Sequence, residues 1–409
     1  MPGIGSVSNL AIMTRKEERA LKEKRILHIM SSYGGGISTF IYNLARSAQE
    51  QNLIFDVATY SDTPDIFDEI IHKTGGAVFR LKNPKRAGWR SYSKSMELPL
   101  KKCRYDAVHC HVSGYRAWAY YQLVKHFQPG LEKDFYIHAH YLYPSEVTSR
   151  STQYKRRIDQ KINRHLSRLP LGCSLQAIDS LFGSQEHGAR VVIPNSISPD
   201  QFMRAPEDQQ AIKQALRKRY ATGNQEILIG QVGRLVPIKN HAFTLNFVQY
   251  SQNKGRPLHL LVAGEGPLKE QLGQQIIQKE LTDSVYLLGR VSPIEALMLG
   301  LDALIMPSFA EGFGTVAVEA QAAGIPVLTS DQVVPEVDLG LGLVKQLSLE
   351  TGEAVWYKEL IKLIDQNNKV QVSNQARSQA VHSHAFSDQA ACAIYRQVLD
   401  YQISRFPIE

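Results

Sequence analysis

The chain is poor in cysteine and has no pair of the Cys-x-x-Cys type. Four cysteines in 409 residues are too few to cross-link a chain of this length, so we expect reduced, mostly buried thiols. No apolar run approaches the ~20 residues that a membrane-spanning helix needs. The polar segment 1–24 also lacks the apolar core of a signal peptide. We therefore expect a cytoplasmic protein.

Internal repeats and low-complexity tracts are also missing, which argues against a solenoid or a long disordered linker. The chain contains no Asp-x-Asp, an arrangement whose oxygens could hold a metal ion against a diphosphate. What is present is a composition of 43% hydrophobic and 21% charged residues, which is typical of a globular protein. Because single cores rarely grow past roughly 250–300 residues, we expect two domains.

The net charge of +8 is concentrated in two stretches. Residues 82–104 hold eight Lys or Arg against one Glu, and residues 150–168 have the period of a helix. In the second stretch a basic stripe lies beside an apolar row, a pattern of helices that lie on anionic membranes. The alternative is a solvated helix face whose apolar side packs on its own domain. The stripe is Arg157, Lys161, Arg164 and Arg168, and the row is Tyr154, Ile158, Ile162, Leu166 and Leu169.

Apolar β-rich runs alternate with helix-period segments along the chain, which predicts parallel sheets covered on both faces. We expect an α/β fold of two Rossmann-like domains, 25–203 and 204–387, with a C-terminal helix within 388–409 that crosses back to the first domain. The expected strands are 25–30, 53–59, 77–81, 107–111, 135–139, 169–173 and 191–194 in the first domain, and 226–232, 258–263, 285–288, 303–306, 326–329 and 341–344 in the second.

The most informative segment is Glu311-Gly-Phe-Gly-Thr-Val-Ala-Val-Glu319, which follows an apolar strand. It predicts a glycine-bearing turn and a helix whose first amides, at Phe313, Gly314 and Thr315, can hold an anion. The carboxylates of Glu311 and Glu319 can accept hydrogen bonds from sugar hydroxyls. This combination suits a sugar joined to phosphate.

Two other segments after strands can also hold phosphate. Gly35 and Gly36 belong to a glycine turn that opens a helix, where backbone amides can approach an anion, although such turns often bind no ligand. Arg234 and Lys239 follow the first strand of the second domain, where they could neutralise a diphosphate; the alternative is a solvated cationic loop.

Histidines are dense at two strand ends of the first domain. His109 and His111 end one strand, and His138 and His140 end another. A metal site is one interpretation, but no Cys or Glu cluster stands at ligand spacing, so we expect none. His111 and His140 are the better candidates for contacts to a sugar or a phosphate.

With these motifs in place, residues 25–400 resemble the family-4 retaining glycosyltransferases of the GT-B fold. His-Ala-His, Lys-Asn-His241 and the 329–356 region resemble bacterial capsular and exopolysaccharide transferases. One departure is Ser196, which stands where the family has a turn glycine. The matching motifs are Gly34-Gly-Gly36, Val108-His-Cys-His111, Ile137-His-Ala-His140, Gly172-Cys-Ser174, Leu181-Phe-Gly183, Pro194-Asn195, Val232-Gly-Arg-Leu235, Lys239-Asn240, Val262-Ala-Gly-Glu-Gly-Pro267, Leu288-Gly-Arg290 and the two glutamates.

The resemblance implies a role for each of these residues. Arg234 and Lys239 would hold the donor diphosphate, helped by the amides of Gly35–Gly36 and Phe313–Thr315. Glu311 would contact the transferred sugar, with His140 beside that sugar or the β-phosphate. The remaining contacts would be Glu319 to the ribose, and Arg290 and Val291 to the base through backbone groups.

We therefore expect a metal-independent, retaining transferase that uses a nucleotide-sugar, best a UDP-sugar, and a lipid-linked glycan at the inner face of the plasma membrane. One alternative keeps the fold and transfers sugar to a soluble acceptor. An alternative from a different functional class is a basic nucleic-acid-binding protein, but neither basic stretch carries a recognised nucleic-acid-binding motif. A catalytically idle partner subunit is disfavoured by the intact Arg234, Lys239, Glu311 and Glu319. The sequence does not fix the oligomeric state.

Overall fold

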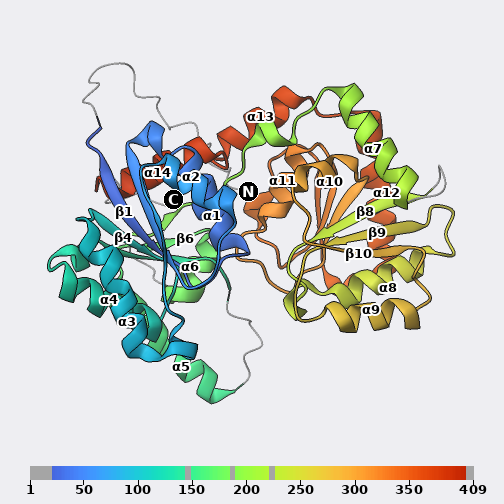
Figure 1. Cartoon of the computed structure of the whole chain (residues 1–409). Helices are drawn as coiled ribbons and strands as arrows, with labels where there is room; N and C mark the ends of the chain where they lie inside the picture. Colours follow the sequence, from blue (N-terminus) through green and yellow to red (C-terminus); the bar gives the residue numbers. More distant parts are fainter. Residues whose placement is uncertain (1–20, 143–148, 185–188, 221–225, 402–409) are drawn as a thin grey trace.

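The structure, a computed structural model, describes residues 21–142, 149–184, 189–220 and 226–401, and the account below concerns these residues. Most of the polar segment 1–24 and the end of the expected tail helix lie outside them. The described residues form two parallel sheets, each covered by helices on both faces (Figure 1). The prediction of two Rossmann-like domains is confirmed.

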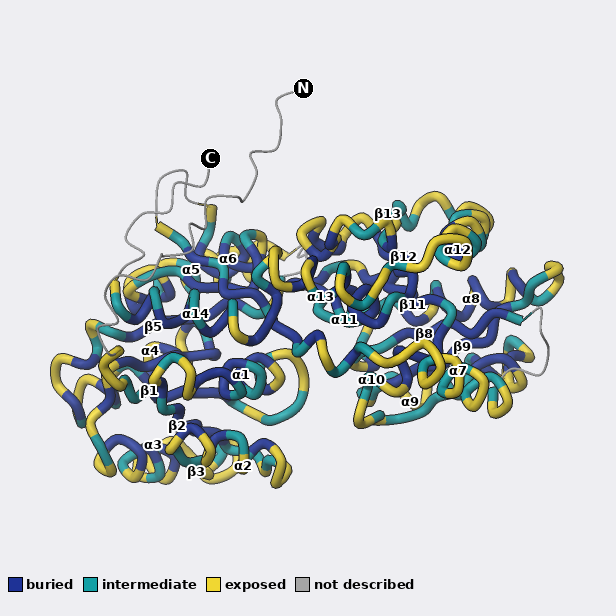
Figure 2. The backbone as a smooth tube through the Cα atoms, turned by 90° about the horizontal axis from the view of Figure 1, so that it is seen from above, coloured by how far each residue is buried: buried dark blue, intermediate teal, exposed yellow. Residues whose placement is uncertain are grey.

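The first sheet has seven parallel strands in the order β3-β2-β1-β4-β5-β6-β7. Its strands are β1 (Lys24–Ile29), β2 (Leu53–Thr59), β3 (Val78–Arg80), β4 (Ala107–Cys110), β5 (Phe135–Ala139), β6 (Pro170–Gly172) and β7 (Val191–Val192). The helices between them are α1 (Gly36–Arg46), α2 (Asp65–Lys73), α3 (Pro84–Lys102), α4 (Tyr115–Phe127), α5 (Arg150–Leu166) and α6 (Leu175–Phe182). The central strands are almost fully buried, as their continuous apolar runs predict (Figure 2).

The second sheet has six parallel strands in the order β10-β9-β8-β11-β12-β13. Its strands are β8 (Ile227–Val232), β9 (Leu258–Ala263), β10 (Val285–Gly289), β11 (Ala303–Met306), β12 (Val327–Ser330) and β13 (Val344–Leu347). The helices of this half are α7 (Pro206–Tyr220), α8 (His241–Ser251), α9 (Lys269–Gln278), α10 (Ile294–Gly300), α11 (Thr315–Ala322), α12 (Gly352–Lys369) and α13 (Asn374–Ser383). The domain boundary expected near residue 203 stays a prediction, and it falls between β7 and β8.

The last strand, β13, lies three residues later than expected. The apolar residues at 341–344 suggested a strand there, but Gly340 and Gly342 have φ angles of 70° and 69°. Left-handed backbone of this kind is typical of turns and incompatible with a strand. Pairing with β12 therefore begins only at Val344.

The final helix, α14 (Asp388–Leu399), crosses back to the first domain as predicted and packs beside α1. Figure 1 shows the chain passing from α13 to α14 between the two halves. The hydroxyl of Tyr395 lies 3.0 Å from Nδ1 of His109, deep in the first domain. Arg396 donates through Nη1 to the Gln51 carbonyl at 2.9 Å. These contacts make α14 part of the first domain's core.

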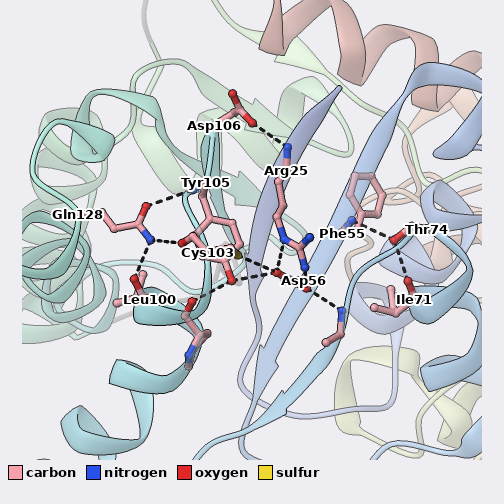
Figure 3. Close-up of polar contacts among 12 residues, drawn as sticks. Arg25, Phe55, Asp56, Ile71, Thr74, Leu100, Cys103, Tyr105, Asp106 and Gln128 are labelled. Carbon is pink, nitrogen blue, oxygen red and sulfur yellow. Dashed lines mark hydrogen bonds and ion pairs between the residues drawn. The ribbon is translucent and has the colours of Figure 1, made fainter. Parts of the chain in front are cut away.

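A buried carboxylate ties the strands of the first sheet together at the end opposite the glycine turn. Asp56, in β2, is fully buried and accepts from Nε and Nη2 of Arg25 at 2.8 and 2.9 Å (Figure 3). The Tyr105 hydroxyl donates to the same carboxylate at 3.0 Å, and the Ala77 N–H donates at 2.7 Å. Such a charge is tolerated in a core only because its oxygens are paired.

The basic helix α5 is only partly a surface stripe. At its C-terminal end Leu166 is buried, and Arg164 donates to the Phe182 carbonyl within the domain. Arg168 lies beyond the helix, where it pairs with Asp134 at 3.4 Å, so the stripe predicted from 157 to 168 is wrong at its end. The first turns of α5 are more exposed than its C-terminal end: the side chains of Tyr154 and Ile158 are exposed by 69% and 40%.

Candidate functional site

Lys239 and Glu311 meet at the carboxyl edge of the second sheet, although 72 residues separate them in the sequence. Nζ of Lys239 donates to Oε1 of Glu311 at 2.6 Å, and the Ser308 hydroxyl donates to the same oxygen at 2.6 Å. Glu311 is only 9% exposed. The two loops are adjacent because β8 and β11, which precede them, are neighbours in the sheet. Both side chains therefore lie beyond the carboxyl ends of their strands, where open parallel sheets bind ligands.

The main chain of Lys239 is held by Gln231, a residue outside the sequence motifs described above. Gln231 is buried in β8, and its Nε2 donates to the Lys239 carbonyl at 2.8 Å. The loops are also joined by the N–H of Phe309, which donates to the Ile238 carbonyl at 2.8 Å. The sequence does offer one indication of this role: Gln231 is a glutamine inside an otherwise apolar strand, and a buried amide requires hydrogen-bond partners.

The loop that carries Arg234 is supported by the glycines of the 262–267 motif. A Cβ on Gly264 would lie 1.8 Å from the Gly233 carbonyl oxygen, and one on Gly266 would lie 2.4 Å from that of Leu235. The N–H of Leu235 donates to the Glu265 carbonyl at 3.0 Å. These glycines therefore serve close packing of the Arg234 loop and need no ligand contact of their own.

The glycine turn of the first domain faces cations of the second. Gly34 and Gly35 have φ angles of 104° and 88°, and Gly36 begins α1, whose N-cap carries no side-chain hydrogen bond. A Cβ on Gly35 would lie 3.8 Å from Cδ of Arg234, and one on Gly34 would lie 3.4 Å from Nη2 of Arg290. An anion at this junction would meet both side-chain cations and helix amides.

The turn that opens α11 docks against the first domain. A Cβ on Gly312 would lie 2.3 Å from the His140 carbonyl oxygen, so only glycine fits there. The Ser174 hydroxyl donates to the Gly312 carbonyl at 2.5 Å. Gly314, at a φ of 98°, leaves the N-terminus of α11 without a side-chain cap, so no side chain occupies the first amides of the helix, beginning with that of Thr315. The docking role of Ser174 was not foreseen.

A cluster of histidines lies in the first domain and ends at His140, whose carbonyl meets Gly312. Nδ1 of His111 lies 2.7 Å from Nε2 of His140, and Nε2 of His109 lies 3.1 Å from Nδ1 of His138. Within the described residues, nitrogens of His28, His109 and His111 come within 4.8 Å of one another, a spacing that a metal could use. Each of the three rings already has a hydrogen-bond partner: His28 and His111 bond to each other, and His109 bonds to His138. The group includes no carboxylate to balance a cation.

Two family models together match most of the chain. The one described as "Glycosyltransferase Family 4" matches residues 34–201, and "Glycosyl transferases group 1" matches residues 212–377. The EpsF protein of Bacillus subtilis (strain 168), named as a glycosyltransferase, is 32% identical over 357 residues, which cover 83% of this chain and 88% of the relative. The chain belongs to this glycosyltransferase family. D-inositol 3-phosphate glycosyltransferase of Corynebacterium urealyticum is 25% identical over 331 residues, or 72% and 74% of the two chains.

Solved structures support the GT-B fold of this glycosyltransferase. Anabaena HepE, determined in complex with UDP-glucose, gives a TM-score of 0.69 at 19% identity, covering 93% of this chain and 100% of the other. WaaG, described as a glycosyltransferase involved in lipopolysaccharide biosynthesis, gives 0.66 at 16% identity with 91% and 99% covered. At such identities the likeness concerns the fold.

The remaining predicted site residues of the glycosyltransferase lie around this junction with fewer contacts. Phe313 is buried and packs edge-on against Phe386, with ring centroids 5.0 Å apart, so its side chain is structural. Val291 follows β10 directly after the exposed Arg290. Ser196 is buried without a left-handed backbone, so the missing family glycine does not distort this turn.

Glu319 gives this glycosyltransferase an expected pH dependence. Burial, and secondarily the carboxylate of Glu295, raises the pKa of Glu319 to about 7 from the ordinary 4.5. If Glu319 binds the donor ribose, as the family resemblance implies, its ionised form accepts hydrogen bonds from the hydroxyls, and the KM for the donor should rise up to about tenfold as the pH falls from 8 to 6. Glu319→Gln should weaken donor binding and flatten this profile. A wild-type KM that does not change with pH would contradict this assignment.

The raised pKa of Glu319 also predicts how the stability of the Glu319→Gln variant depends on pH. A carboxyl whose pKa is raised by folding stabilises the protein below its unfolded pKa, and this contribution is lost as the pH rises through about 7. The variant, which cannot ionise, should therefore melt above the wild type at pH 8. At pH 5 the two melting temperatures should nearly coincide.

Proposed function

We propose that this glycosyltransferase moves a sugar with retention of configuration from a nucleotide-sugar, best a UDP-sugar, to a lipid-linked glycan. The observation that carries the donor side is the convergence of Arg234, Lys239 and the amide-bearing turns of both domains on one junction. Opposing cations and helix N-termini suit a diphosphate. The HepE complex with UDP-glucose supports the choice of nucleotide.

Within this proposal, Arg234 and Lys239 bind the diphosphate and stabilise it as it leaves. Glu311, already oriented by Lys239 and Ser308, accepts hydrogen bonds from the transferred sugar. Glu319 binds the ribose. Nine further residues are proposed to contact the base, the sugar or the phosphates. The residues for these contacts are Arg290, Val291, His111, His140, Gly35, Gly36, Phe313, Gly314 and Thr315.

We propose a same-face displacement without a metal ion. The leaving phosphate oxygen accepts the proton of the acceptor hydroxyl while fixed cations and amides balance the charge, so catalysis consists of positioning and electrostatic stabilisation. The absence of Asp-x-Asp from the sequence and the lysine already placed beside Glu311 support this choice. Closure of the two domains around the donor would exclude water.

A donor screen by released nucleoside diphosphate, with and without EDTA, tests the proposal. We expect release from a UDP-sugar at the same rate in both conditions. A rate that EDTA abolishes and Mg²⁺ or Mn²⁺ restores would contradict the metal-independent mechanism. Failure of every nucleotide-sugar with an intact fold would contradict the donor assignment.

The acceptor side is supported by a cavity of about 600 Å³ next to the junction. It is lined by the β4–α4 turn, by Tyr141 and by the first turns of α5. Tyr141 directly follows His140, so the cavity adjoins the proposed reacting sugar. Exposed Tyr115 offers an aromatic ring to a sugar, while Arg116 and Lys155 offer charge to a phosphate. These features favour a glycan joined to phosphate.

Exposed aromatic and basic side chains on three neighbouring helices of the first domain support contact with an anionic membrane. Helix α4 packs against both α3 and α5. Each of the three helices carries an exposed aromatic residue: Trp89, Trp118 and Tyr154 are exposed by 48%, 43% and 69%. Amphipathic aromatic rings and cations are favoured at the headgroup layer. No helix among the described residues is long and apolar enough to cross a membrane, so the proposed contact is peripheral.

Vesicle flotation tests this contact. Replacing exposed Arg157 and Lys161 of α5 by alanine should lower binding to vesicles of an anionic phospholipid by about tenfold or more, because each cation near the surface contributes about 1 kcal/mol. Lys358 and Lys362 of α12 are exposed with the same spacing and provide the matched double variant, which should bind as the wild type does. Equal flotation of both variants would favour a soluble acceptor.

A further inference from the structure

Four buried histidines and the partly buried His140 form two separate hydrogen-bonded rows in the first domain. In the first row, Nδ1 of His28 lies 3.1 Å from Nε2 of His111, whose Nδ1 lies 2.7 Å from Nε2 of His140. The row crosses three neighbouring strands diagonally, since His28 lies in β1 opposite His109, while His111 and His140 directly follow β4 and β5. In the second row, His109 joins the Tyr395 hydroxyl to His138 at 3.0 and 3.1 Å.

The rings of the first row are neutral. Burial lowers the pKa of His28 and of His140 to about 3, and that of His111 falls well below its ordinary value for the same reason. A neutral imidazole carries one N–H and one lone pair, so each ring donates at one nitrogen and accepts at the other. The bond between His28 and His111 therefore fixes the direction of the bond between His111 and His140.

Only two proton arrangements satisfy the first row. If His28 donates to His111, then His111 donates to Nε2 of His140, and His140 carries its proton on Nδ1. If the direction is reversed, Nδ1 of His140 presents a lone pair. Nε2 of His28 and Nδ1 of His140, the two ends, are buried and have no hydrogen-bond partner within the described residues. Exchange between the arrangements needs a proton to enter at one end and leave at the other.

We propose that His28 and His111 are positioning residues that keep His140 protonated on Nδ1, as a neutral hydrogen-bond donor to the sugar or the departing phosphate. This inference rests on the proposed function, which supplies oxygen acceptors beside His140. Those acceptors favour the donating arrangement, because a lone pair facing a phosphate oxygen would be repelled.

A neutral donor has a consequence for the reaction. An imidazolium is acidic enough to protonate the leaving phosphate, which would remove the lone pair that has to accept the acceptor's proton. A neutral imidazole stabilises charge on an oxygen by hydrogen bonding while keeping its own proton. A carboxylate partner would favour the imidazolium, whereas a row of neutral rings does not.

The first row also explains a buried polar residue that the site otherwise leaves unused. His28 is fully buried in β1, where it packs edge-on against Phe55 at 4.6 Å between ring centroids. Its hydrogen-bonded connection to His140 runs through His111. Its conservative replacement is Asn, whose amide can donate from the position of Nδ1, while Leu removes the donor.

The experiment uses the full chain with ¹⁵N-labelled histidine and long-range ¹⁵N–¹H correlation, which distinguishes the two neutral tautomers. His140→Gln assigns the His140 signals. We expect the Nδ1–H form in the wild type with UDP, a mixture of tautomers in His28→Leu, and recovery in His28→Asn. In parallel, kcat should fall about tenfold in His28→Leu and recover in His28→Asn, with the donor KM within about twofold.

Tyr395→Phe is the matched control, because it removes the hydroxyl that ends the second row of the same cluster and should leave the His140 tautomer and kcat unchanged. An Nε2–H form of His140 in the wild type would overturn the proposal, and so would a His28→Leu variant with unchanged tautomer and kcat. If His28→Leu does not fold, the wild-type tautomer still decides. If UDP leaves the His140 signals unmoved and no UDP-sugar turns over, the proposed donor fails separately.

Discussion

Replacing Lys239 by alanine should lower the rate of sugar transfer by about 10²–10³-fold while the protein stays folded. The lysine is the one side-chain cation that already lies against Glu311 among the described residues, at 2.6 Å, on the edge where the diphosphate is proposed to bind. Removing a group that stabilises developing charge typically costs this factor. The measurement is the kcat for release of nucleoside diphosphate, together with a melting curve for each variant.

The matched control is Lys213→Ala in the same domain. Nζ of Lys213 lies 2.7 Å from the Asp302 carboxylate and is similarly half-buried, but it belongs to α7, away from the junction. Both variants lose one ammonium and one ion pair, so a fall in kcat shared by both would indicate a general loss of charge or stability. Full activity of Lys239→Ala would remove the residue from the proposed mechanism.

The pair also predicts non-additive effects with Glu311. Glu311→Ala should abolish most transfer on its own, since it removes the proposed contact to the sugar and releases Lys239 from its position. The double variant should therefore be little worse than either single variant, because residues that act as a unit do not add. Additive losses would indicate that the two side chains act independently.

The fold could be predicted because parallel sheets require runs of buried apolar residues. Segment 303–306 is apolar throughout and matches β11, and segment 258–263, apolar except for His259, matches β9. The expectation failed at β13, where two left-handed glycines convert an apolar segment into a turn. Apolar content alone does not distinguish these cases, since the backbone conformation here is decided by Gly340 and Gly342 rather than by the leucines beside them.

The site could be predicted in part because residues that follow parallel strands gather at one edge. That rule brought Lys239 and Glu311 together. Contacts that depend on docking between domains, such as Ser174 with Gly312, leave no periodic signal in the sequence. The partner of His28 likewise becomes evident only when β1 lies beside β4, because a lone histidine in a strand resembles an ordinary core residue.

The second large effect concerns stability and lies far from the proposed chemistry. Asp56→Ala should lower the free energy of unfolding of the first domain by about 3–5 kcal/mol, the usual cost of breaking a buried ion pair on one side. The variant leaves Arg25, the Tyr105 hydroxyl and the Ala77 N–H without the carboxylate that they share. Urea unfolding followed by tryptophan fluorescence, with Trp89 and Trp118 in this domain, measures the change.

The control is Glu97→Ala, which breaks an ion pair with Lys101 on α3, where the two side chains are 39% and 61% exposed. An exposed pair at this spacing contributes about 0.3–0.5 kcal/mol. Comparing the two variants therefore distinguishes the stability lost with a buried carboxylate from the stability lost with any ion pair. Residual transfer by the folded fraction of Asp56→Ala should keep the wild-type KM for the donor, because the carboxylate holds the strands at the end of the sheet away from the junction. A small change in stability for Asp56→Ala would mean that water replaces the lost carboxylate.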